Sequence, residues 1–346
     1  MKTIKKLLAL TLVLCMVFCL SSAVFAADSQ DANFTKTYKI TNDGTSNPEE
    51  TFTFSFTADH VTDSNANLTT AQMPAITASS VKFDAGTATT SGLQKTVDVA
   101  LSNVNWPGVG VYYYKVNETA GNTAGVTYDN ATAYLKVTVA YSERTNTYYT
   151  AFVTLSLADE NGDGQTDSKT AGFTNVYSAG SLSISKNVTG NMGNQDTYFA
   201  VKVTLKGETN KTYASSYSVS QTSYTQNPTA IEIGKETTFN LKHGETITIS
   251  NLPYGVKYTV VEDNYTAEAD GGYEAAKYSL NDGTDTTTSI TDEELDSASE
   301  SVKITNRKNT GIDMGVTLDS LPYILALAVV FGGAVVMFTR KRHVED

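Results

Sequence analysis

The chain has 346 residues, of which 25 are Lys or Arg and 37 are Asp or Glu, so its formal net charge is −12. This acidity argues against a nucleic-acid partner, because phosphate backbones select basic surfaces. Three histidines and two cysteines leave little for a metal cluster, and the sequence indicates no cofactor. Its alternating runs rich in Thr, Tyr, Val and Ser are typical of β-sheet.

Residues 1–26 have the pattern of a secretory signal peptide. Three lysines precede an apolar core, Leu7 to Leu20, and Val24-Phe25-Ala26 provides a small-residue cleavage site. Both cysteines, Cys15 and Cys19, lie inside this segment. The exported protein therefore contains no cysteine, and it cannot use the disulfides that stabilise many secreted domains.

The middle of the chain consists of predicted strands. Thr51 to Phe56, Thr132 to Ala140 and Phe199 to Leu205 alternate between polar and apolar residues, and turn signals such as Asn281-Asp282-Gly283 separate such runs. No amphipathic helix of convincing length occurs among them. Short alternating strands at this spacing predict β-sandwiches.

An internal repeat divides these strands into two units that join near Ser178. Both units share an opening strand with a lysine, a middle strand ending in a glutamate and a closing strand with an asparagine. The corresponding segments are Phe34 to Ile40 and Leu182 to Val188, Gly110 to Glu118 and Gly255 to Glu262, and Phe173 to Asn175 and Ile304 to Asn306.

Strand parity places these three polar residues on apolar faces. Side chains two residues apart share a face, so Lys36 lies with Phe34 and Tyr38, Glu118 with the tyrosines of its strand, and Asn175 with its aromatic neighbours. The same parity puts Lys186, Glu262 and Asn306 on the apolar faces of the second unit. Each unit is therefore predicted to bury one Lys, one Glu and one Asn.

Burial predicts reactive chemistry for these groups. Desolvation lowers the pKa of a lysine and raises that of a glutamate, which favours a neutral amine beside a protonated acid. The acid can polarise the Asn carboxamide, and attack by the amine with loss of ammonia would leave a Lys–Asn isopeptide bond. Glu118 and Glu262 would act once per bond, as autocatalytic acids without turnover. The alternative is a buried salt bridge in which the Asn is merely hydrogen-bonded.

The C-terminal segment, residues 309–346, resembles the cell-wall sorting signal of Gram-positive surface proteins. The 18-residue apolar run from Leu321 to Phe338 is long enough to span a bilayer and is followed by a basic cluster. Ahead of it, a sortase would cut between Thr310 and Gly311, although Asn309 stands where a proline is common. The alternative is an ordinary single-span membrane anchor.

With these motifs, the sequence resembles the Gram-positive major, or backbone, pilins of the streptococcal type. The similarity implies an all-β chain with two tandem Ig-like (CnaB-type) β-sandwich domains at residues 27–178 and 179–308. It also implies isopeptide bonds joining Lys36 to Asn175 and Lys186 to Asn306.

The resemblance further implies polymerisation, in which sortase links Thr310 of one subunit to a lysine of the next. Lys169 is the expected acceptor, because it precedes the first closing strand in an apparent surface loop. A competing calcium-loop pattern begins at Asp159, but its twelfth residue is Thr170 and not the glutamate that such loops use, so an acidic turn is preferred.

The resemblance therefore implies a structural pilus subunit at the cell wall or surface, held in the membrane only as a precursor. Its expected partners are sortase, identical subunits, the peptidoglycan anchor, and possible minor pilins and host surfaces. It is not expected to be an enzyme beyond the single-turnover bond formation. The alternative is a wall-anchored adhesin or minor pilin that is not polymerised.

Overall fold

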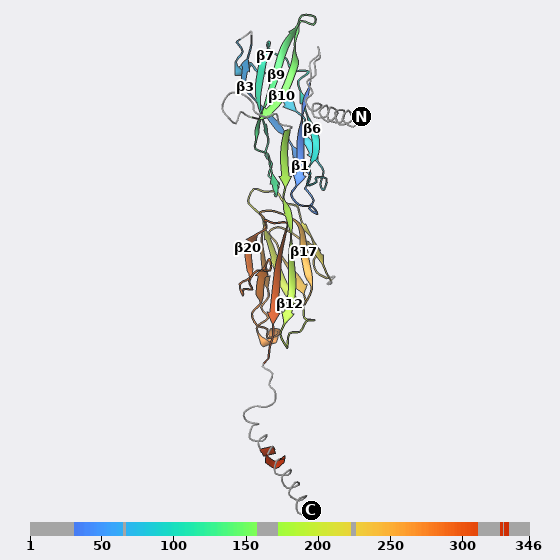
Figure 1. The fold of residues 1–346 in the computed structure, drawn as a ribbon, viewed down its shortest axis with the longest axis vertical. Helices are drawn as coiled ribbons and strands as arrows, with labels where there is room; N and C mark the ends of the chain where they lie inside the picture. The colour runs from blue at the N-terminus through green and yellow to red at the C-terminus, as the bar shows by residue number, and fades with distance from the viewer. Residues whose placement is uncertain are drawn as a thin grey trace, which may run out of the picture.

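The computed structural model describes residues 31–64, 67–157, 172–222, 226–310, 326–327 and 329–331. These residues form two β-sandwiches that lie end to end along the long axis of the molecule (Figure 1). The predicted all-β tandem sandwich is confirmed. The predicted signal peptide and nearly all of the predicted membrane span lie outside the described residues, and no helix within them is long and apolar enough to cross a membrane.

The first sandwich packs a five-stranded sheet against a four-stranded one. In spatial order, the five-stranded sheet contains β4 (Thr77–Ala78), β6 (Leu93–Ala100), β1 (Ala32–Ile40), β11 (Gly172–Tyr177) and β8 (Val126–Thr127). The facing sheet contains β10 (Thr147–Leu157), β9 (Thr132–Ser142), β7 (Gly110–Glu118) and β3 (Phe54–Thr62). A small pair, β2 (Glu50–Phe52) and β5 (Val81–Phe83), stands beside them.

The second sandwich packs a six-stranded sheet against a four-stranded one. The larger sheet contains β15 (Ala230–Ile231), β14 (Tyr217–Gln221), β17 (Thr246–Pro253), β12 (Ala179–Thr189), β21 (Ser299–Arg307) and β19 (Lys277–Leu280). The smaller sheet contains β16 (Glu236–Leu241), β13 (Phe199–Lys206), β18 (Lys257–Glu262) and β20 (Ile290–Glu294). Among the described residues, one 3₁₀ turn, Thr70–Gln72, lies in the connection between β3 and β4 of the first sandwich. Another, Glu268–Asp270, lies in the connection between β18 and β19 of the second.

In both sandwiches the opening strand pairs in parallel with the closing strand. β1 lies beside β11 in the first sandwich, and β12 lies beside β21 in the second. Parallel pairing requires a crossover between the two strands, and here the rest of each sandwich forms that crossover. The two ends of each sandwich's chain segment therefore meet in the middle of one sheet.

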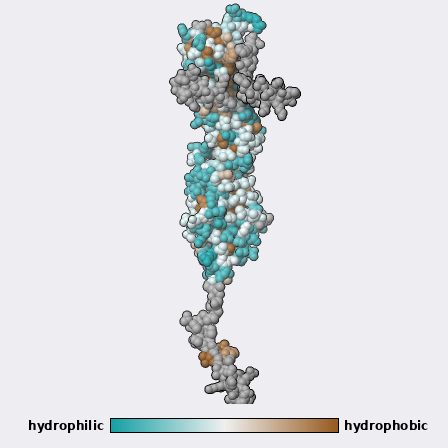
Figure 2. All heavy atoms as spheres, in the orientation of Figure 1, coloured by the Kyte–Doolittle hydropathy of each residue, from teal (hydrophilic) through white to brown (hydrophobic). Residues whose placement is uncertain are grey.

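Period-2 alternation produces the two cores. Every second residue of β7 is buried, and the same holds for the second half of β1 and for β18. The single tryptophan, Trp106, is buried in the first core, where its ring packs 4.7 Å from that of Tyr112. On the face drawn in Figure 2, hydrophilic residues cover most of the second sandwich.

Hydrogen bonds join the two sandwiches at their junction. Asn42 Nδ2 donates to the carbonyl of Ala179 at 2.9 Å and to the hydroxyl of Tyr254 at 2.8 Å. Asn251 exchanges two bonds with the backbone of Ser46, each 2.8 Å long. These contacts hold the end of the first sandwich against the adjoining end of the second.

Candidate functional site: two buried Lys–Glu–Asn clusters

The first cluster lies between the two sheets of the first sandwich. Lys36 on β1 and Asn175 on β11 come from neighbouring strands, while Glu118 reaches across from β7 in the facing sheet. Lys36 Nζ lies 2.5 Å from Glu118 Oε2, and Asn175 Nδ2 donates to Glu118 Oε1. Lys36 and Asn175 are both fully buried. The carboxyl group thus bridges the amine and the carboxamide.

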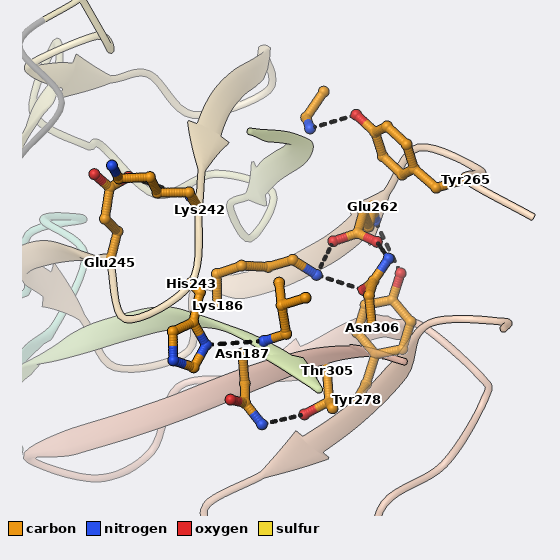
Figure 3. A network of polar contacts seen from close by, with 12 residues as sticks. Lys186, Asn187, Lys242, His243, Glu245, Glu262, Tyr265, Tyr278, Thr305 and Asn306 are labelled. Carbon is orange, nitrogen blue, oxygen red and sulfur yellow. Dashed lines mark hydrogen bonds and ion pairs between the residues drawn. The ribbon is translucent and has the colours of Figure 1, made fainter. Parts of the chain in front are cut away.

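The second cluster repeats this arrangement (Figure 3). Lys186 Nζ lies 2.6 Å from Glu262 Oε2, and Asn306 Nδ2 donates to Glu262 Oε1 at 2.6 Å. Here the lysine also donates directly to Asn306 Oδ1. The predicted burial of all six residues is therefore observed, and the two predicted sets of three are brought together.

Strand register explains why both clusters have the same form. The residue opposite Lys36 on the parallel neighbour is Phe173, and the residue opposite Lys186 is Ile304. In each case the asparagine lies two positions farther along the closing strand. Two residues along a strand return to the same face, so lysine and asparagine point into the same core as diagonal neighbours.

An aromatic ring covers each lysine. Lys36 Nζ lies 4.4 Å from the ring centroid of Phe52, and Lys186 Nζ lies 4.1 Å from that of Phe199. These rings exclude water from the amines. Neither phenylalanine is among the site residues that the sequence predicts. Both lie in strands that alternation predicts, but alternation gives a residue's face and not the residue it will contact.

Burial moves the pKa values of both clusters toward uncharged groups. Desolvation lowers the pKa of Lys36, with the nearby Glu118 opposing the shift, and it lowers the pKa of Lys186 to about 8. Desolvation likewise raises the pKa of Glu118 and of Glu262, against the opposing effect of the paired lysine. A neutral amine beside a protonated acid becomes accessible in each core.

The C-terminal segment of the second sandwich is held by hydrogen bonds to the turn after β12. Asn191 accepts from Thr310 N–H through Oδ1 and donates to the Thr310 carbonyl through Nδ2, both at 3.1 Å. The backbone N–H of Asn191 donates to Asn309 Oδ1 at 3.1 Å. Thr310 itself is exposed. Gly311, Lys169 and the residues from Asp159 on that are predicted to form an acidic turn lie outside the described residues.

Two family models match adjacent parts of the chain. Residues 32–178 match the Spy0128-like isopeptide containing domain, and residues 180–308 match a domain of unknown function, DUF7601. A protein named pilin, from Streptococcus pyogenes serotype M1, is 28% identical over 328 residues, covering 89% of this chain and 90% of the relative.

Solved structures of pilins share the fold. The crystal structure of the major pilin from Streptococcus pyogenes matches with a TM-score of 0.54 and 23% identity, over 82% of this chain and 100% of that one. The major pilin T3.2 of the same species matches with a TM-score of 0.54 and 24% identity, over 82% and 99%. The relatives are structural pilins and not enzymes. Residues 32–178 thus resemble the Spy0128-like isopeptide containing domain, and the chain as a whole resembles the Gram-positive backbone pilins.

Proposed function

We propose that this protein is the backbone subunit of a surface pilus, stabilised by isopeptide bonds from Lys36 to Asn175 and from Lys186 to Asn306. The observation that carries the proposal is the recurrence of one geometry. In two separate cores, a fully or almost fully buried lysine and asparagine share a buried glutamate at hydrogen-bond distance. Coincident salt bridges would not require an asparagine at the same diagonal position in both.

The chemistry proposed for each cluster is a single amide exchange. The neutral lysine Nζ attacks the asparagine Cγ, and the protonated glutamate polarises the carboxamide. The Cγ–Nδ2 bond then breaks, ammonia leaves with the proton that the glutamate supplies, and the glutamate regains a proton from Nζ. The folded core holds both reactants together, which is how enzymes gain much of their acceleration. No external group is required, so Glu118 and Glu262 act only once.

The proposal extends to assembly by sortase at the cell surface. Cleavage after Thr310 would give an acyl group that the amine of Lys169 on the next subunit accepts. The exposure of Thr310 at the far end of the second sandwich supports a donor role. Identical subunits, the sortase and a peptidoglycan anchor are the implied partners, with minor pilins and host surfaces as further possibilities.

Intact mass of residues 27–310 tests the intramolecular bonds. The native protein should weigh two ammonia molecules less than its translated sequence. Glu262→Gln should prevent the Lys186–Asn306 bond, so that the protein weighs only one ammonia less than its translated sequence. Glu118→Gln should prevent the Lys36–Asn175 bond instead, with the same loss of one ammonia. A native protein at its full translated mass would contradict the covalent account and leave two buried salt bridges.

A separate experiment tests polymerisation. The cell-wall fraction of a producing strain should give a ladder of high molecular weight on denaturing gels, and Lys169→Ala should abolish it. Lys95→Ala, which removes another lysine from the first sandwich, is the matched control and should leave the ladder unchanged. A wall-bound monomer alone would favour the second candidate, a wall-anchored adhesin or minor pilin.

A further inference from the structure

The carboxamide of Asn175 is held at both of its ends. Its nitrogen donates to Glu118, as described above, and its oxygen accepts from the backbone N–H of Asp129 at 2.9 Å. The amide is thereby oriented with its leaving group toward the acid and its carbonyl oxygen toward a fixed donor. This is the arrangement that an acyl-transfer reaction needs at its electrophile.

The side chain of Asp129 fixes that donor in place. Oδ2 accepts from the N–H of Thr174 at 2.8 Å, and Oδ1 accepts from the N–H of Ala131 at 3.0 Å. Thr174 is the residue immediately before Asn175 on β11. The connection between β8 and β9 is therefore tied to the closing strand at the reacting residue, and the N–H donor is preorganised.

We propose that the backbone N–H of Asp129 is the oxyanion donor for formation of the Lys36–Asn175 bond, and this inference rests on the function proposed above. When Lys36 Nζ attacks Cγ, the electron pair of the carbonyl moves to Oδ1, and the N–H of Asp129 stabilises the developing negative charge. Collapse of the tetrahedral intermediate returns the pair, and Nδ2 departs as ammonia with a proton from the glutamate.

The second cluster differs at this atom. Asn306 Oδ1 accepts from Lys186 Nζ, which is itself the reacting amine. The two bonds form in one molecule under the same conditions, so the Lys186–Asn306 bond is an internal control for any change at Asp129.

The carboxylate of Asp129 has an electrostatic effect that a test must separate from its N–H. Its charge opposes the lowering of the Lys36 pKa and adds to the raising of the Glu118 pKa. A side-chain substitution therefore alters both the charge and the loop. Replacing residue 129 with L-malic acid, the α-hydroxy analogue of aspartate, changes only the N–H to an ester oxygen.

The experiment uses residues 27–310 prepared by chemical ligation in denaturant, where neither bond has formed, and then folded by dilution, with samples quenched over time and both crosslinked peptides quantified by mass spectrometry. The ester variant should form the first bond about 10²–10³-fold more slowly, the usual loss when one oxyanion donor is removed, and the second bond at the native rate. Fluorescence of Trp106, the single tryptophan and a residue of the first core, verifies that this sandwich has folded.

Two side-chain variants decide the matter if the ester variant does not fold. Asp129→Ala keeps the N–H but frees the connection, and it should slow the first bond. Asp129→Asn retains a side-chain acceptor and should recover part of the rate. An unchanged rate in the ester variant, or in Asp129→Ala without it, would overturn this inference alone. Absence of both ammonia losses in the native protein would instead overturn the proposed function.

Discussion

The buried lysines are costly residues if their only role is an ion pair. Removing two charges from water costs several kcal/mol per ion, and apolar residues of similar volume often serve a core as well or better. Stability alone therefore gives no reason for Lys36 and Lys186 to occupy these positions. The proposed reaction, which consumes the amine and leaves a neutral amide, would remove the penalty permanently and would account for the asparagine beside each pair.

The pH dependence of bond formation follows from the shared proton. The reactive pair holds one proton, either as a neutral amine with a protonated acid or as their ion pair, so the ratio of these two forms does not change with pH. At pH values below the raised pKa of Glu262, both groups are protonated, and the amine cannot attack. At pH values above the lowered pKa of Lys186, about 8, both groups have lost their protons, and no acid remains to assist the reaction.

We therefore expect a bell-shaped rate for the Lys186–Asn306 bond, with a decline above about pH 8. First-time folding of chains without crosslinks, ligated in denaturant, at a series of pH values, followed by quantification of the crosslinked peptide, measures this rate. The folded fraction at each pH, followed by circular dichroism, is the control. A rate that continues to rise well above pH 8 would show that the amine alone limits the reaction and that no acid takes part.

At the level of elements, each proposed bond links the opening strand of a sandwich to its closing strand. The linked residues are separated by 139 positions in the first sandwich and by 120 in the second. Chain-entropy arithmetic, borrowed from disulfides, gives about 5 kcal/mol for each loop. This is comparable to the whole stability of a typical domain, about 5–15 kcal/mol, in a protein whose two cysteines, Cys15 and Cys19, both lie in the predicted signal peptide.

The turn after β12 also depends on a close approach between elements. Gly190 has a φ of +92°, and a Cβ there would clash with the carbonyl oxygen of Lys308, which accepts from the N–H of Met192 at 3.1 Å. Gly190 is therefore required both by its own backbone conformation and by the segment that leads to Thr310.

Gly190→Ala should release that segment. Gly234→Ala is the matched control, because Gly234 has a φ of +79° but open space at the Cβ position. Both variants bear the backbone strain of a left-handed residue, about 1–2 kcal/mol, whereas only the first should speed hydrogen exchange at the amides of Met192 and Thr310. Equal exchange at these amides in the two variants would contradict the role of Gly190 in holding the segment that leads to Thr310.

At the scale of the whole molecule, the order of strands determines how tension crosses a subunit. With Lys169 and Thr310 as the proposed attachment points, force enters near the end of the first sandwich, passes along β12 and leaves after β21. The bond between Lys186 and Asn306 would carry that force directly between the two strands. The residues between Lys186 and Asn306 in the sequence would then bear no load. The force would also bypass most of the first sandwich.

Single-molecule pulling through these two points should distinguish the two bonds. Lys186→Ala should let the second sandwich extend by roughly 400 Å, the length of about 120 residues, whereas the native subunit should not extend. Lys36→Ala should behave like the native subunit, because its bond lies outside the path of the force. An Lys186→Ala subunit that keeps its native length would refute this assignment of the load.

The sequence alone determined the fold class and the faces of the polar residues. Strand alternation has a fixed period of two, so the parity of Lys36, Glu118 and Asn175 with their apolar neighbours can be counted along each strand. The repeat then supplied the second set. These predictions use only local geometry, and for that reason they agree with the structure.

Only the tertiary structure decided which residues complete each site. The ring of Phe52 above Lys36, the N–H of Asp129 at Asn175 and the hold of Asn191 on Thr310 all join segments distant in sequence. Such contacts depend on how sheets face each other and how connections fold back, and neither follows from a local period. The backbone donor has no sequence signature at all, because every residue except proline carries the same N–H.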